Sequence, residues 1–99
     1  MKFSDLQAQV HKTAVTSGWH DKERSFSDFI ALFHSEVSEA FEEYRSTGYI
    51  TPKVLIELAD VIIRIMDFCE LYNYDLEGAI VAKDVINQER PYRHGNKAL

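Results

Sequence analysis

Two pairs of carboxylates are the side chains of this sequence best suited to chemistry. Glu36 and Glu39 lie three residues apart in the run HSEVSEAFEEYR, and Glu57 and Asp60 have the same spacing in IELADVIIRIMD. On an α-helix this spacing is about 60° around the axis, so both carboxylates of a pair can reach one point. Two such helices side by side would surround one space with four carboxylates, a ligand set that suits Mg²⁺ or Mn²⁺.

Each pair also has a simpler interpretation, because glutamates three residues apart are common on solvated helix faces. A single pair therefore carries little weight. The hypothesis of a metal site depends on the presence of two pairs, the second of them on a strongly apolar helix. The alternative is a non-catalytic, oligomeric helical binding or regulatory protein whose acidic residues are merely solvated.

The periodicity of apolar residues predicts four helices that would position these side chains. Ser4, with Gln7 three residues later, has the pattern of a capping box, Thr51 precedes Pro52 at a first helical position, and Asp75 can cap a last helix. The expected helices cover residues 5–16, 26–45, 52–71 and 76–90. Their short connections predict an all-α fold, an antiparallel four-helix bundle-like protomer.

Two of these helices carry further information. Lys83, Asn87 and Arg90 fall on the same face as the apolar residues of 76–90, so they are expected to point inward and to pair with carboxylates or with ligand phosphates. The helix 52–71 is apolar around more than half of its circumference. We therefore expect the protomer to oligomerise, as a homodimer or homotetramer.

Size and composition fit one domain spanning residues 1–99, with 45% hydrophobic and 27% charged residues. The net charge of −5 argues against nucleic-acid binding, which needs a basic surface. Cys69 is the only cysteine, which favours a reducing, cytoplasmic setting. Charged residues interrupt the apolar stretch 54–71, so no membrane span is expected.

The motifs together resemble the MazG-like nucleotide pyrophosphohydrolases of the all-α NTP pyrophosphatase superfamily. The resemblance covers about residues 29–97, and it rests on E-x-x-E at 36–39, E-x-x-D at 57–60 and the closing pattern K-x-x-x-N-x-x-R-P-Y-R-H-G at 83–95. It implies Mg²⁺-dependent cleavage of a nucleoside triphosphate between the α and β phosphorus atoms, which releases a monophosphate and pyrophosphate. Related branches act on phosphoribosyl-ATP or on dUTP.

The resemblance also implies roles for individual residues. Glu36, Glu39, Glu57 and Asp60 would be the metal ligands. Independently of the resemblance, oxygen ligands allow Mn²⁺ in place of Mg²⁺, and a carboxylate that the metal does not fully engage, Glu36 or Glu39, would accept the proton of the attacking water. The implied substrate-binding residues are Lys83, Asn87, Arg90, Tyr92, Arg93 and His94. Asn96 stands where many relatives have a basic residue, so the resemblance assigns no phosphate contact to that position.

Overall fold

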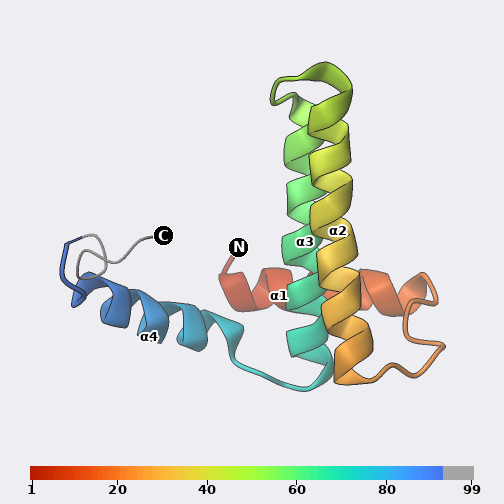
Figure 1. Ribbon diagram of the computed structural model, residues 1–99. Coiled ribbons are helices and arrows are strands. Elements are labelled where there is room, and N and C mark those ends of the chain that lie inside the picture. Colours follow the sequence, from red (N-terminus) through yellow and green to blue (C-terminus); the bar gives the residue numbers. More distant parts are fainter. Residues whose placement is uncertain (93–99) are drawn as a thin grey trace.

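The computed structural model of the protein describes residues 1–92 and contains four helices and no strand in that part of the chain (Figure 1). They are α1 (Phe3–Thr16), α2 (Phe26–Thr47), α3 (Pro52–Leu71) and α4 (Leu76–Gln88). This confirms the all-helical prediction. None of the helices within residues 1–92 is long and apolar enough to cross a membrane.

Local hydrogen bonds explain where three of the helices begin. The hydroxyl of Ser25 accepts a hydrogen bond from the backbone N–H of Asp28, whose carboxylate in turn accepts from the backbone of Ser25. Thr51 caps α3 and Asp75 caps α4, as the sequence predicted. Each side-chain acceptor satisfies a backbone donor that the first turn of a helix leaves without a partner.

The prediction for the start of α1 is wrong. Ser4 is not the capping residue, because the helix already begins at Phe3 and Lys2 occupies the capping position. The carboxylate of Asp5 accepts the backbone N–H of Lys2 at 3.1 Å. Gln7 is instead buried against α3, where its amide donates to Glu70 at 3.1 Å and to the carbonyl of Tyr74 at 3.2 Å.

Helices α2 and α3 form an antiparallel hairpin, and α1 lies across it on the α3 side (Figure 1). Gly48 ends α2 with a φ of +81°, a left-handed conformation that an L-residue adopts only under strain. At the other end of the hairpin, Phe29 is 3% exposed and its ring centroid lies 4.9 Å from that of Phe68. Aromatic packing therefore joins α2 to α3 where the chain enters and leaves the hairpin.

Helix α4 extends away from the other three helices, and none of its residues is buried (Figure 1). Within one chain, the packed unit therefore consists of α1, α2 and α3. The expectation that Lys83, Asn87 and Arg90 point into a core of their own chain is wrong, because all three are exposed. The apolar residues of α4 are exposed as well, among them Ile80, Val81, Val85 and Ile86.

The hairpin also presents apolar side chains to solvent. Leu55 is 65% exposed, Leu58 43% and Ile62 57%, as expected for an α3 that three helices cannot cover. Met66 and Cys69 of the same helix are buried within their own chain, so they are not part of this exposed surface. Burial raises the pKa of the Cys69 thiol.

Candidate metal centre between helices α2 and α3

The hairpin brings three of the four predicted metal ligands together. Glu36 and Glu39 from α2 and Glu57 from α3 each offer a carboxylate oxygen, and these oxygens lie within 4.8 Å of one another. The antiparallel packing of α2 on α3 explains this arrangement, since it places the middle of α2 beside the first turns of α3. We call Glu36, Glu39 and Glu57 the acidic group.

Asp60 is near the acidic group without belonging to it. It lies one turn after Glu57 on α3, and its negative charge helps to raise the pKa of Glu36. Its oxygens are nevertheless outside the set that lies within 4.8 Å. A cation held by the acidic group would therefore have Asp60 beside it, either as a further ligand after a side-chain rotation or through a bound water.

Burial and charge repulsion together disfavour the ionised form of Glu36. Its side chain is only 12% exposed. Removal from water raises the pKa of this carboxyl group above its ordinary value of 4.5, and the charges of Glu39 and Asp60 raise it further. A divalent cation would relieve this repulsion, because it replaces the missing water and offsets the crowded charges.

Arg64 is the cation that partly offsets Glu36 in the protein alone. Its Nε lies 3.6 Å from Oε1 of Glu36 and lowers the pKa of that carboxyl group, against the stronger effects that raise it. The Nε is buried and makes no hydrogen bond to residues 1–92. Within the described residues, the Nε of Arg64 is therefore held near the acidic group by charge and not by a hydrogen bond.

Trp19 connects this site to the loop between α1 and α2. The guanidinium carbon of Arg64 lies 3.7 Å from the centroid of the Trp19 ring, and that of Arg24 lies 4.6 Å from it. Arg24 also donates a hydrogen bond to the carbonyl of Trp19. Cation–π contacts of this kind hold the indole against α3 next to Glu36. The spacing of residues in the sequence gave no sign of the contact between Trp19 and Arg64.

A pocket of about 360 Å³ lies between α1 and α3 beside these residues. Trp19, Asp60 and Arg64 line one part of it, and Val10, Thr13, Ala14, Ser17 and Ile63 line the rest. It thus combines an aromatic ring, a cation and a carboxylate with an apolar wall. This composition is typical of sites that bind small molecules.

The predicted substrate-binding residues lie elsewhere in the chain. Lys83 and Asn87 line a shallow pocket formed by α4 alone, and Arg90 and Tyr92 follow that helix as exposed residues. Helix α4 points away from the hairpin, and no ion pair within residues 1–92 joins Lys83 or Arg90 to the acidic group (Figure 1). Arg93 and His94 lie outside the described residues.

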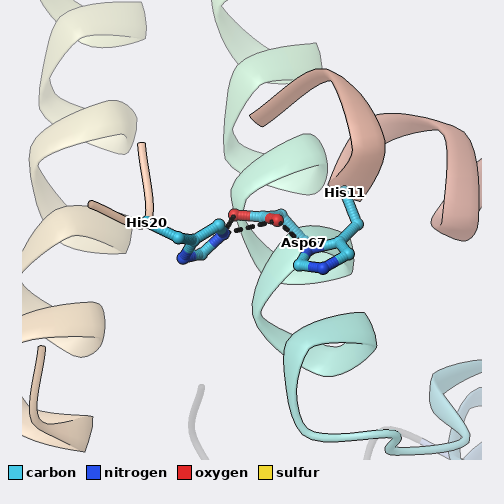
Figure 2. A group of neighbouring side chains, drawn as sticks. All are labelled: His11, His20 and Asp67. Carbon is cyan, nitrogen blue, oxygen red and sulfur yellow. Dashed lines mark hydrogen bonds and ion pairs between the residues drawn. The ribbon is translucent and has the colours of Figure 1, made fainter. Parts of the chain in front are cut away.

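A second group of potential metal ligands was missed by the sequence reasoning. His11 of α1, His20 of the following loop and Asp67 of α3 meet at one point, with hydrogen bonds from both imidazoles to the Asp67 carboxylate (Figure 2). Asp67 lies 47 residues after His20 in the sequence, and no spacing rule connects it to the two histidines. The only signal in the sequence is that Asp67 lies seven residues after Asp60, about two helical turns along α3, and so on the same side of that helix.

Comparisons of the chain with family models, with curated proteins and with solved structures gave no match.

Proposed function

We propose that this protein is a Mg²⁺-dependent nucleotide pyrophosphohydrolase that cleaves a nucleoside triphosphate to the monophosphate and pyrophosphate. The observation that carries the proposal is the convergence of Glu36, Glu39 and Glu57 from two helices on one point. An all-oxygen, multiply charged ligand set is the kind that Mg²⁺ prefers. The order of the E-x-x-E, E-x-x-D and N-x-x-R-P-Y-R-H-G motifs supports the same activity.

The residues of the acidic group would have two roles, metal binding and proton transfer. Mg²⁺ held by these residues would offset the negative charge of the phosphates and make a water easier to deprotonate. Glu57 and Glu39 would hold the metal, with Asp60 beside them. Glu36 is the better proton acceptor, because burial and the charges of Glu39 and Asp60 raise its pKa above the ordinary value of a glutamate. As a water oxygen bonded to the α phosphorus, Glu36 would accept one of the water's protons. The bond between the α phosphorus and the bridging oxygen would break, and that oxygen would leave with pyrophosphate.

Cations are also needed where the negative charge of the leaving pyrophosphate develops. Among residues 1–92, Arg64 is the cation that pairs with the acidic group, through Glu36. Lys83, Asn87 and Arg90 lie on or after α4, which presents both these groups and exposed apolar side chains to solvent. We infer that α4 of a second copy covers the hairpin in a homodimer or homotetramer and brings these residues toward the substrate.

The proposed substrate is a free nucleotide in the cytoplasm, and the net charge of −5 disfavours a nucleic-acid polymer. The pocket that contains Trp19 is the position at which a base could stack, next to the acidic group. Phosphoribosyl-ATP and dUTP remain alternative substrates of the same reaction type, because they present the same polyphosphate to the metal.

A non-catalytic function is the second candidate, and the exposed apolar side chains of α3 and α4 favour it. A helical partner or a second copy could bind these surfaces without any chemistry at the acidic group. Such a binding protein would gain no thermal stability from Mg²⁺. The proposed enzyme would gain stability, since a ligand that binds only the folded state shifts the unfolding equilibrium.

The proposal is tested with a panel of ribo- and deoxyribonucleoside triphosphates, dUTP and phosphoribosyl-ATP, incubated with and without Mg²⁺. Pyrophosphate and orthophosphate are measured separately. Release of pyrophosphate that requires Mg²⁺ is expected, and the fastest substrate identifies the branch. Release of orthophosphate alone, or no turnover of any nucleotide, would contradict the proposal.

A further inference from the structure

We propose that His11, His20 and Asp67 form a second metal site, selective for a transition metal such as Zn²⁺ and distinct from the acidic group. His11 Nδ1 lies 2.8 Å from Oδ1 of Asp67, and His20 Nε2 lies 2.9 Å from each carboxylate oxygen. One ligand atom from each residue falls within 4.8 Å of the others. Figure 2 shows both rings directed at the carboxylate from opposite sides.

The chemistry of these ligands separates the two sites. The acidic group offers only carboxylate oxygens, which suit Mg²⁺, whereas two imidazole nitrogens and one carboxylate suit Zn²⁺, Co²⁺ or Ni²⁺. The ligands also come from three different elements, namely α1, the loop at 17–25 and α3. A metal at this point would therefore cross-link the parts of the fold that position Trp19.

The burial of the three residues is consistent with such a site. The Asp67 side chain is 1% exposed, while His11 is 23% and His20 13% exposed. A buried carboxylate needs a cationic or hydrogen-bonding partner, which is provided by the imidazoles in the protein alone and would be provided by the metal in the loaded protein. The partial exposure of the two rings leaves an approach for the ion and for a water as fourth ligand.

Metal binding at this site would require only a small movement of the His11 and His20 side chains. A tetrahedral metal bonded at about 2.0–2.1 Å separates its ligand atoms by about 3.3 Å, so each imidazole would move back from the carboxylate by about half an ångström. His20 belongs to a loop, which can accommodate this shift. The coordinating nitrogens must be unprotonated, so the single proton of each neutral imidazole would reside on His11 Nε2 and His20 Nδ1.

Trp19 provides a direct readout, because it is the only tryptophan and it precedes His20 in the chain. Its ring rests against Arg64, whose Nε lies 3.6 Å from Glu36. A metal at the second site would fix this loop and change the environment of the indole. Occupancy of the second site is thereby linked structurally to the acidic group.

The test uses full-length protein freed of metal with a chelator and titrated with Zn²⁺ by calorimetry and Trp19 fluorescence. One Zn²⁺ per chain should bind at this site, and His20→Gln or His11→Gln should weaken binding by at least about 100-fold, since even outer-shell partners are worth 10–100-fold. His34→Gln, at an exposed histidine of α2, should leave binding unchanged. Glu57→Gln should also leave it unchanged, because that residue belongs to the acidic group.

Co²⁺ provides a measurement that does not depend on the variants folding. The unmodified protein should show the intense visible absorption of tetrahedral Co²⁺, whereas an all-oxygen octahedral site gives only weak bands. Absence of Zn²⁺ binding, a weak octahedral spectrum, or binding that is lost in Glu57→Gln but kept in His20→Gln would overturn the proposal. In any of these cases, the three residues form only a hydrogen-bonded group.

Discussion

The folded structure disfavours the ionised form of Glu36, and this makes the stability of the protein depend on pH. Its pKa is raised by burial first and by Glu39 second, while Arg64 acts in the opposite direction. The folded protein therefore holds this proton more tightly than the unfolded chain does. The contribution of this proton to the free energy of unfolding is fully present below pH 4.5, the ordinary pKa of a glutamate. It is lost as the pH rises through the raised pKa of Glu36.

We expect Glu36→Gln to remove this dependence in metal-free protein. The variant and the unmodified protein should differ least in acid, and the variant should become progressively more stable as the pH rises from 4.5 toward neutrality. The difference between two urea-denaturation series isolates Glu36, because every other titratable residue is the same in both proteins. A difference that stays constant with pH would show that Glu36 ionises in the fold as it does in water.

The positions of Glu57 and Asp60 predict unequal contributions to Mg²⁺ binding. Glu57 belongs to the acidic group, whereas Asp60 lies beside it. Asp60→Asn should therefore weaken Mg²⁺ binding by about 10–100-fold, the effect of an outer-shell partner, and Glu57→Gln should weaken it by more. Calorimetric titration of both variants with Mg²⁺ shows which substitution lowers the affinity more. Equal losses of Mg²⁺ affinity would mean that Asp60 is a direct ligand.

The residue types and spacing were sufficient to predict that Glu36, Glu39 and Glu57 meet, because helical periodicity fixes which side chains share a face. Spacing could not predict that Arg64 reaches Glu36 or that it lies against Trp19. Those contacts depend on how the loop at 17–25 folds back onto α3. The position of a loop is determined by tertiary packing, which periodicity does not describe.

The ends of the elements could be predicted where a capping side chain was present. Thr51, Pro52 and Asp75 gave the starts of α3 and α4. The predicted start of α1 was two residues too late, because Lys2 occupies the capping position and Asp5 accepts its backbone N–H. The role of Gln7 was missed for the same reason. A polar residue at a helix start can cap the helix or pair across an interface, and only the tertiary structure decides between the two.

The capping box of α2 should contribute to stability at the entrance of the hairpin. Ser25→Ala removes the hydroxyl that accepts the N–H of Asp28 and should lower the free energy of unfolding by about 1 kcal/mol. Ser27→Ala is the matched control, since Ser27 is exposed in the first turn and caps nothing. Chemical denaturation of both variants measures the difference. Equal effects of the two substitutions would contradict the assigned role.

At the scale of the whole molecule, the separation of α4 is the feature that the sequence could not predict. The apolar pattern of residues 76–88 correctly indicated a helix with a face to bury. Periodicity does not specify which molecule buries that face, and within one chain α4 has no buried residue. The prediction of a bundle therefore held for the helical content but not for the packing of α4 within its own chain.

If copies associate through the exposed face of α3, Ile62→Glu should separate them. Ile62 is 57% exposed in the single chain, so the substitution should change the stability of a monomer by no more than about 0.5 kcal/mol. Burying the new carboxylate in an interface should weaken association by at least about 100-fold. Sedimentation velocity and circular dichroism measure the two effects separately.

Ile50→Glu is the control for this substitution, because Ile50 is 74% exposed and lies in the turn of the hairpin rather than on α3. It should leave association intact. Met66→Glu would be uninformative, since Met66 is 2% exposed and its replacement would disrupt the core of the chain itself. A monodisperse monomer of the unmodified protein with full activity would contradict the role given to a second copy.

The most direct measurement of the central claim is pyrophosphate release by the unmodified protein, by Glu57→Gln and by Glu42→Gln at increasing Mg²⁺. Glu42 is an exposed glutamate of α2 that pairs with Arg45, so its substitution is a matched change of charge outside the acidic group. We expect Mg²⁺-dependent pyrophosphate release that falls by about 100-fold or more in Glu57→Gln and is kept in Glu42→Gln. Turnover that survives in Glu57→Gln, or that needs no Mg²⁺, would contradict the account.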